Sequence, residues 1–307
     1  MRAVVFAGQG AQAVGMGRDL AESNPDIRAL YERAKAELGY DLARLCWEGP
    51  EDELVKSDRC QPAIFVTSAA CWEALRRARP GLSVQAAAGL SLGEWTALWL
   101  AGAVSFEEAL RILAARGRFI QEACDEQPGA MLSVIGLDPG ALEAVAAKAG
   151  VEIANYNSPE QTVLSGRAEG IQAAERLARE AGAKRVVPLA VAGAFHSSLM
   201  ASAARRLDEF LRSVSFRPPS LPVLSNVTGR LHGGPEEIRR AMVKQVTSPV
   251  RWLQGVQHLR QQGLAAAIEC GPGRVLSGLI KRTAPDVVLA NVQDAASLAK
   301  TAAALSD

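Results

Sequence analysis

Apolar runs of strand length and segments of helical period alternate along the first part of the chain. Residues 4–7 form a short apolar run, and apolar positions recur at helical spacing over residues 26–38, 64–77 and 106–123. A second short run of small residues precedes Ser91, at residues 84–88. The alternation of strands and helices favours an α/β sheet.

The order of elements changes after residues 125–129, where the letters DEQPG interrupt the pattern. The segments that follow predict the order βαββαβ, at residues 131–136, 140–149, 151–154, 162–165, 170–181 and 185–191. This order matches a ferredoxin-like unit.

A helix at residues 198–214 returns the chain to its first pattern. A proline-rich linker, a strand at 223–227 and a helix-rich C-terminal portion follow. We therefore expect one large α/β domain, residues 1–126 and 195–307, interrupted by an insert at residues 127–194.

The composition excludes several classes of protein. The chain has 307 residues, is 49% hydrophobic and 22% charged, and carries 34 basic and 33 acidic residues, as expected of a soluble globular enzyme. A formal net charge of +1 argues against nucleic-acid binding, which normally leaves a clustered basic excess. No signal peptide or membrane-spanning run is recognisable, so we expect a cytoplasmic protein. The five cysteines form no CxxC pair and predict neither disulfides nor a metal site.

Ser91 carries the clearest chemical signal. It lies in the sequence Gly-Leu-Ser-Leu-Gly at residues 89–93, between a predicted strand and a predicted helix. Glycines on both sides allow a sharp turn and a close approach of the helix, and the first N–H groups of that helix can stabilise an oxyanion. The frame indicates a covalent serine enzyme, with a plain tight turn as the alternative.

A nucleophilic serine needs a base, because its hydroxyl is nearly inert at neutral pH. The chain offers three histidines. His232 lies in a glycine-rich segment that reads as an exposed turn, and His258 lies on a polar-rich helix that reads as solvated. His196 follows an apolar run and stands where the insert rejoins the large domain, where a cleft is expected. We therefore favour His196 as the base, with a structural buried histidine as the alternative.

A set of ordered motifs extends across nearly the whole chain and resembles the malonyl-CoA:acyl carrier protein transacylases and polyketide synthase acyltransferases. The motifs are FAGQGAQ (6–12), QPAIF (61–65), GLSLGE (89–94), ARG (115–117), YNSP (156–159), GAFHS (193–197), SNVTG (225–229) and ECGPGRVL (269–276). The resemblance implies an α/β-hydrolase-like large domain with a ferredoxin-like insert.

The resemblance also implies roles for individual residues. Ser91 is the nucleophile and His196 the base, and the main-chain oxygen of Gln245 orients the imidazole in place of a carboxylate. The side chain of Gln245 reads as an ordinary surface glutamine. The N–H groups of Gln9 and Leu92 form the oxyanion hole. Gln61 matches another position in the substrate pocket, where it supports the substrate.

Arg116 and Phe195 are the residues that bear on the acyl group. An arginine on an otherwise apolar helix is usually at the surface, but the matching arginine of the family lies in the pocket and binds the free carboxylate of malonyl. Phe195 precedes the proposed base and is expected to limit the size of the acyl pocket, with a plain core position as the alternative. The segment 193–197 resembles the malonyl-selective form of its motif.

The chain departs from the common pattern of the family at Leu90, where many relatives have histidine, and at Ala7, where many have proline. Leu90 resembles the discrete acyltransferases that serve modular polyketide synthases in trans, so the pathway is open between fatty-acid and polyketide synthesis.

Two enzyme hypotheses follow from this sequence. The first is a ping-pong transferase that moves malonyl from malonyl-CoA to the phosphopantetheine thiol of an acyl carrier protein, without a cofactor. The second is a hydrolase of the same fold, such as a thioesterase that clears carrier proteins. Arg116 favours the first, because a buried clamp for a carboxylate serves malonyl and has no use for a neutral ester. A docking scaffold with an inactive elbow ranks last, because Ser91 and His196 are both present.

Overall fold

The computed structural model describes residues 1–305, and a four-stranded parallel sheet forms the centre of its larger part. The sheet has the order β2-β1-β7-β8, and its strands are β1 (Arg2–Phe6), β2 (Ala86–Gly89), β7 (Ala266–Cys270) and β8 (Val288–Val292). All three neighbouring pairs are parallel. The predicted α/β class is therefore confirmed.

Helices cover both faces of this sheet, because successive side chains of each strand point to opposite faces. Val4 and Phe6 of β1 belong to one buried apolar cluster, and Ala3 and Val5 belong to another. The first cluster includes side chains from the helices α1 (Arg18–Ser23), α2 (Pro25–Leu38), α5 (Ser57–Ala78), α6 (Leu92–Leu100), α7 (Phe106–Glu126) and α10 (Ala201–Leu211). The second cluster includes side chains from α12 (Trp252–Gln261) and α13 (Val275–Thr283). Shorter or peripheral elements are α3 (Leu42–Glu48), α4 (Glu51–Leu54), η1 (Ser198–Met200), α11 (Pro235–Lys244), η2 (Gln245–Thr247) and α14 (Ala295–Ala304).

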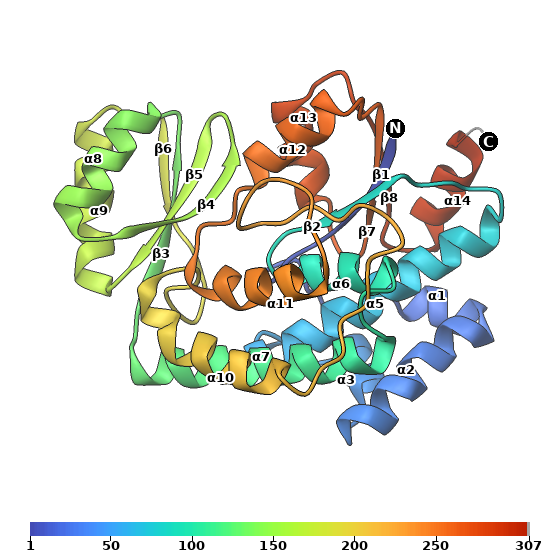
Figure 1. Cartoon of the computed structure of the whole chain (residues 1–307). Coiled ribbons are helices and arrows are strands. Elements are labelled where there is room, and N and C mark those ends of the chain that lie inside the picture. The colour runs from blue at the N-terminus through green and yellow to red at the C-terminus, as the bar shows by residue number, and fades with distance from the viewer. Residues whose placement is uncertain (306–307) are drawn as a thin grey trace.

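A second, antiparallel sheet stands beside the first, at the left in Figure 1. Its elements are β3 (Ala130–Ile135), α8 (Pro139–Ala149), β4 (Glu152–Ser158), β5 (Gln161–Gly166), α9 (Ala168–Glu180) and β6 (Arg185–Pro188). The strand order β4-β5-β3-β6 and the βαββαβ sequence are those of a ferredoxin-like unit, as predicted. The expected boundaries at residues 126/127 and 194/195 stay a prediction.

Backbone hydrogen bonds link the smaller sheet to a segment of the larger part. The N–H of Tyr156 in β4 donates to the carbonyl of Val250 at 2.9 Å, and the N–H of Val250 donates to the carbonyl of Ala154 at 2.8 Å. The segment before α12 therefore pairs with β4 and fixes the smaller sheet against the larger part.

One prediction for the C-terminal part is incomplete and another is wrong. The portion is helix-rich as predicted, but it also contains β7 and β8, of which β7 pairs directly with β1. Residues 223–227 form no strand, although Val223 makes an isolated bridge to Ala87 of β2. The segment cannot continue as a strand because Asn226 turns into the site, where its side chain bonds the elbow.

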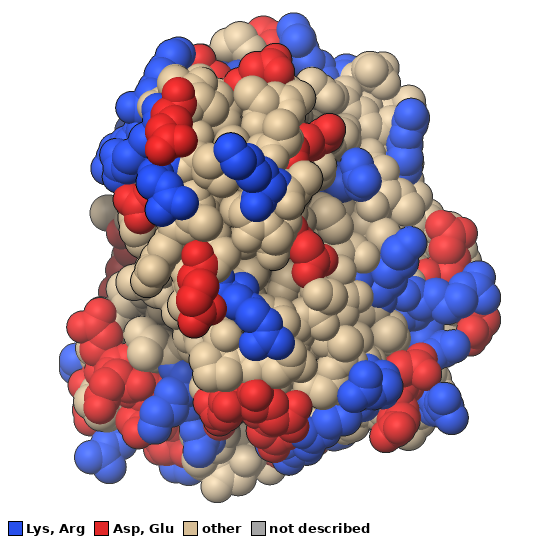
Figure 2. Space-filling view, turned by 90° about the vertical axis from the view of Figure 1, so that its left-hand side faces the viewer, with Lys and Arg blue, Asp and Glu red and all other residues tan. Residues whose placement is uncertain are grey.

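Charge is mixed over the surface, as the near balance of acidic and basic residues predicts. Figure 2 shows Lys and Arg interspersed with Asp and Glu on the face that includes the smaller sheet, without a continuous field of either sign. Within residues 1–305, no helix has both the length and the apolar character needed to cross a bilayer.

Candidate active site

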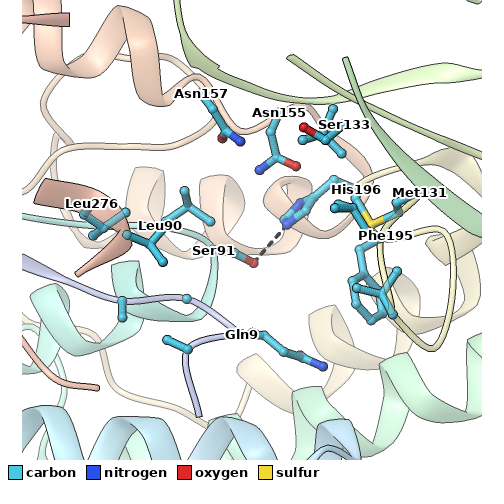
Figure 3. Close-up of a pocket in the computed structure, with 18 of the residues that line it drawn as sticks. Gln9, Leu90, Ser91, Met131, Ser133, Asn155, Asn157, Phe195, His196 and Leu276 are labelled. Atoms are coloured by element: carbon cyan, nitrogen blue, oxygen red, sulfur yellow. Dashed lines mark hydrogen bonds between the residues drawn. The ribbon is translucent and has the colours of Figure 1, made fainter. Parts of the chain in front are cut away.

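Ser91 occupies the sharp turn between β2 and α6. Its backbone has a φ of 54° and a ψ of −106°. For a residue other than glycine, this conformation costs about 1–3 kcal/mol of free energy. The flanking glycines make the turn possible: a Cβ on Gly89 would lie 2.0 Å from the carbonyl of Gly93, and a Cβ on Gly93 would lie 2.2 Å from the oxygen of Phe6. Helix α6 therefore packs directly against strand backbone, and Ser91 lines the pocket (Figure 3).

His196 lies opposite Ser91 and is fixed from two sides. Its Nδ1 is 2.8 Å from the carbonyl oxygen of Gln245, and its Nε2 is 2.9 Å from Oγ of Ser91. A carbonyl can only accept, so Nδ1 carries the proton and the lone pair of Nε2 faces the serine hydroxyl. Apart from Ser91, His196 is the only non-glycine residue of the described chain with a positive φ, at 57°. The hydroxyl of Ser197 donates to the carbonyl of Ala194 at 2.7 Å and stabilises this turn.

Arg116 reaches the same serine from α7. Its Nη2 donates to Oγ of Ser91 and to Oε1 of Gln245, both at 3.0 Å, and its Nη1 donates to Oε1 of Gln61 at 2.7 Å. The residue is only 2% exposed, so the surface alternative is wrong. All three acceptors are neutral, and no carboxylate of residues 1–305 pairs with the guanidinium. A buried cation with only neutral partners is able to take an anion as a further partner.

Burial and the neighbouring cation set the protonation states of the site. Desolvation and then the charge of Arg116 lower the pKa of His196 from 6.5 to about 4. Desolvation lowers the pKa of Arg116 to about 10, and the charge of Glu94 opposes this shift. At neutral pH the imidazole is therefore neutral and able to accept a proton, whereas the guanidinium remains charged.

The pocket of about 380 Å³ lies between the two sheets, at the carboxyl ends of β1 and β2. In Figure 3, Gln9, Leu90 and Ser91 lie on the side of the larger part, and the smaller sheet contributes polar side chains such as Ser133, Asn155 and Asn157 on the opposite side. His196 lines this pocket, which therefore lies where the sequence predicts a cleft, at the junction of the insert and the large domain.

Two backbone N–H groups are unoccupied beside Ser91. Neither Gln9 nor Leu92 donates its main-chain N–H to an acceptor within residues 1–305. The side chain of Gln9 has other partners: its Nε2 donates to Oγ of Ser57 at 3.1 Å, and its Oε1 accepts from Gln61 at 3.2 Å. Gln61 thus connects the loop after β1 to Arg116.

Phe195 lines the pocket next to His196. It packs against a small apolar cluster that contains Met131 and Val163, and it also contacts the larger core. In Figure 3 its ring lies beside Met131, on the side of the pocket formed by the smaller sheet. Phe195 is therefore both a packing residue and part of the pocket wall.

Comparison with known proteins identifies the family. The Acyl transferase domain family matches residues 3–303. The chain belongs to the acyl transferase family.

Named relatives narrow this assignment. The acyltransferase is 40% identical over 299 residues to the malonyl CoA-acyl carrier protein transacylase of Haemophilus influenzae, with 96% of each chain covered. It is also 40% identical to the polyketide biosynthesis protein ThaF of Burkholderia thailandensis, over 93% of this chain and 24% of that longer protein. Among solved structures, a malonyl-transacylase in complex with its type II polyketide synthase acyl-carrier protein matches with a TM-score of 0.95 and 40% identity, covering 98% of this chain and 99% of that one.

The structure corrects two sequence interpretations of this acyltransferase. His232 is not in an exposed turn: its side chain is 1% exposed and its Nε2 lies 2.6 Å from Oε1 of Glu94. The side chain of Gln245 is buried and bonds Arg116, Ser91 and Glu94, so the surface interpretation is wrong. His258 does lie at the surface on α12, next to Arg230.

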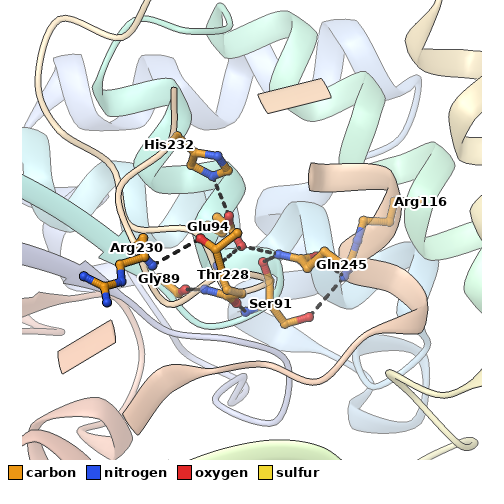
Figure 4. A network of polar contacts seen from close by, with 9 residues as sticks. Gly89, Ser91, Glu94, Arg116, Thr228, Arg230, His232 and Gln245 are labelled. Atoms are coloured by element: carbon orange, nitrogen blue, oxygen red, sulfur yellow. Dashed lines mark hydrogen bonds and ion pairs between the residues drawn. The ribbon is translucent and has the colours of Figure 1, made fainter. Parts of the chain in front are cut away.

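Sequence reasoning missed two residues that shape the site. Asn226 accepts from the N–H of Ser91 at 2.6 Å and donates to the carbonyl of Gly89 at 2.8 Å, so one side chain ties both sides of the elbow. Glu94 is buried on α6, one turn after the serine (Figure 4). A signal for Glu94 existed, because it is the only charged residue of the apolar helix LGEWTALWL. Asn226 lies in the SNVTG motif, but nothing in that motif indicated its contact with the elbow.

The influence of Arg116 on His196 leads to a prediction about titration. Replacing the arginine removes a positive charge that disfavours the imidazolium, so the pKa of His196 in Arg116→Met should rise from about 4 toward, but not up to, 6.5, because burial remains the larger cause. Histidine NMR titration measures this directly. Arg118→Met, an exposed change on the same helix, is the control and should leave the value unchanged. Equal titration of His196 in both variants would contradict the electrostatic account.

Proposed function

We propose that this acyltransferase moves malonyl from malonyl-CoA to the phosphopantetheine thiol of an acyl carrier protein through an ester on Ser91. The observation that carries the proposal is the contact of Arg116 with Oγ of Ser91 at 3.0 Å, which places an unpaired buried cation beside the nucleophile. The relatives named above support it, since they include a malonyl transacylase and a transacylase bound to its acyl-carrier protein. They lend no support to the hydrolase alternative.

In the first half-reaction, Oγ of Ser91 attacks the thioester carbonyl while Nε2 of His196 takes the hydroxyl proton. The oxyanion that forms is bound by the N–H groups of Gln9 and Leu92, which have no other acceptor among residues 1–305. Collapse breaks the C–S bond, and the proton held by His196 passes to the departing thiolate of coenzyme A. The carbonyl of Gln245 stabilises the imidazolium in the meantime through Nδ1.

The second half-reaction runs the same steps with a new nucleophile. The carrier-protein thiol gives its proton to Nε2 of His196 and attacks the ester carbonyl, and Ser91 leaves with that proton. Side chains of the acyltransferase itself carry both steps, so malonyl-CoA is a substrate and no cofactor is required.

Arg116 selects the acyl group in this scheme. The free carboxylate of malonyl pairs with the guanidinium in a bidentate contact, which lysine could not reproduce, and takes the place of the serine hydroxyl as its partner. Gln61 and Gln245 hold the guanidinium in place through their side-chain oxygens. A simple acyl chain would leave this cation buried without an anion, and so transfer of acetyl is disfavoured.

The role of Ser91 is tested by mass spectrometry of the intact protein after mixing with malonyl-CoA. We expect a malonyl adduct on the native protein and none on Ser91→Ala. His196→Ala should slow adduct formation by about 10²–10⁴-fold or more, because the general base is lost. His258→Ala is the matched control at the surface and should react like the native protein. An undiminished adduct on Ser91→Ala refutes the assignment.

Replacement of Arg116 should invert the acyl preference. In Arg116→Met we expect malonyl transfer to fall by a factor that corresponds to about 2–5 kcal/mol, because the carboxylate loses its partner. Transfer of acetyl should be kept or increased, because no cation is left unpaired. Competition between malonyl-CoA and acetyl-CoA, read as the ratio of kcat/KM, decides the matter. Equal losses for the two substrates would assign Arg116 a structural role only.

Phe195 is proposed to limit branching at the α-carbon of the acyl group. A methyl branch would collide with the ring, at a cost of about 1–3 kcal/mol, so malonyl should be preferred over methylmalonyl by roughly 10-fold to 100-fold. Phe195→Ser should narrow this preference. The measurement is the malonyl to methylmalonyl ratio of kcat/KM in both proteins, together with a thermal melt. An unchanged ratio in a folded variant would place the selectivity elsewhere.

A further inference from the structure

A chain of buried polar contacts lies behind Ser91 and outside the pocket lining (Figure 4). Glu94 is its centre and is 0% exposed. Its Oε2 accepts from Nε2 of Gln245 at 2.6 Å and from the N–H of Asn226 at 3.2 Å, and its Oε1 accepts from Nε2 of His232 at 2.6 Å. The proposed reaction uses neither Glu94 nor His232.

The carboxylate of Glu94 decides which way the amide of Gln245 faces. A carboxylate only accepts hydrogen bonds, so the NH₂ end of the amide must point to it, and the oxygen end then points to Arg116. A flipped amide would set oxygen against carboxylate and NH₂ against guanidinium, two repulsive contacts in place of two attractive ones. The observed orientation is therefore the only one that satisfies both neighbours.

Gln245 transmits this orientation to three parts of the site. Its Oε1 binds the guanidinium of Arg116 at 3.0 Å, its Nε2 also donates to the carbonyl of Ser91 at 3.0 Å, and its own carbonyl holds His196 at 2.8 Å. A displacement of this one residue would disturb the nucleophile, the base and the anion site together.

His232 supplies the second contact that the carboxylate needs. Without it, Oε1 of Glu94 would be a buried charged atom with no donor. The ring of His232 has no competing hydrogen bond, because its Nδ1 is buried and has no partner within the described chain. The contact joins residues that are 138 positions apart, so it forms only when the large part is folded around α6.

We propose that Glu94 and His232 are positioning residues of this acyltransferase, which act through the Gln245 side chain on both acyl selection at Arg116 and activation of Ser91. The inference rests on the proposed function, since it assigns these residues a part in that reaction. It also makes a claim that is independent of malonyl, namely that the pair sets the reactivity of the serine.

Two amide substitutions at His232 provide a matched test. A glutamine places its NH₂ near the position of Nε2, which bonds Glu94, whereas an asparagine places it near Nδ1, which does not. We expect His232→Gln to retain most activity. His232→Asn should lose up to about 10²-fold in malonyl transfer, on the scale of a misplaced catalytic group, and should lose more for malonyl than for acetyl because Arg116 is loosened.

Three readouts separate positioning from mere stability. They are self-acylation by malonyl-CoA and by acetyl-CoA, the rate at which a fluorophosphonate probe labels Ser91, and the thermal melting temperature. Tyr31→Phe, which removes a buried hydroxyl contact with Thr67 far from the site, is the stability control. It should lower the melting temperature without changing the malonyl to acetyl ratio or the labelling rate.

The outcomes are distinguishable. If the native protein is labelled by the probe but takes no malonyl, the proposed function fails, and the labelling rates of the two His232 variants still decide the positioning claim. Suppose that the native protein is malonylated. The positioning claim is then overturned if both His232 variants match the native protein in the malonyl to acetyl ratio and in the labelling rate. It is also overturned if the two variants show equal losses in these two quantities. Should His232→Asn fail to fold, Glu94→Met replaces it, because methionine has a similar length but cannot accept the hydrogen bonds that Gln245 and His232 donate to the carboxylate. An unchanged ratio and labelling rate in that variant would also overturn the claim.

Discussion

The buried guanidinium of Arg116 is the constraint around which the site is arranged. A cation that is 2% exposed must be solvated by the protein, and here the contacting atoms are the side-chain oxygens of Gln61, Gln245 and Ser91. The charge of Glu94 also favours the charged form of Arg116 without direct contact, and the side chain of Gln245 bonds both residues. The cation is thus stabilised enough to stay charged, but it retains the capacity to bind an anion in the pocket.

Backbone strain at two residues is the second feature that the surrounding structure has to support. Ser91 and His196 both have positive φ, and the contact between their side chains at 2.9 Å depends on both turns being kept. The elbow at Ser91 is secured by Asn226, which bonds the backbone on either side of it. A hydroxyl-to-carbonyl contact across the turn secures His196. Strain is stored on both partners of the proposed reaction and balanced by buried hydrogen bonds nearby.

The parts of the fold that local pattern determines were predictable from the sequence, and the parts that depend on distant contacts were not. The βαββαβ unit and the elbow at Ser91 follow from periodicity and glycine placement over a few residues. Strands β7 and β8 have five residues each, and two of the five in β7 are alanine, so no local pattern distinguishes them from helix until β7 pairs with β1. His232 reads as exposed because glycines follow it, and only its contact with Glu94 buries it.

The same distinction applies to the site. The family resemblance predicted a common site for Ser91, His196, Arg116, Gln61 and the backbone of Gln245, and the structure connects these residues by hydrogen bonds. The role of the Gln245 side chain could not be foreseen, because its partners lie on α7 and at the start of α6, far from Gln245 in the sequence, and meet it only in the folded chain. A residue whose main chain and side chain serve different neighbours gives no pattern in the sequence.

The arrangement links recognition of the acyl group to the strength of the base. In the free acyltransferase, the charge of Arg116 lowers the pKa of His196, and the guanidinium also occupies the serine oxygen. On the proposed mechanism, a substrate carboxylate that pairs with Arg116 would neutralise that charge, so the imidazole would become a stronger base and the hydroxyl would lose one of its contacts. An acyl group without a carboxylate produces neither change. On the proposed mechanism, selectivity would therefore appear in the rate of the chemical step as well as in binding, because the group that recognises malonyl also restrains the nucleophile until malonyl is bound.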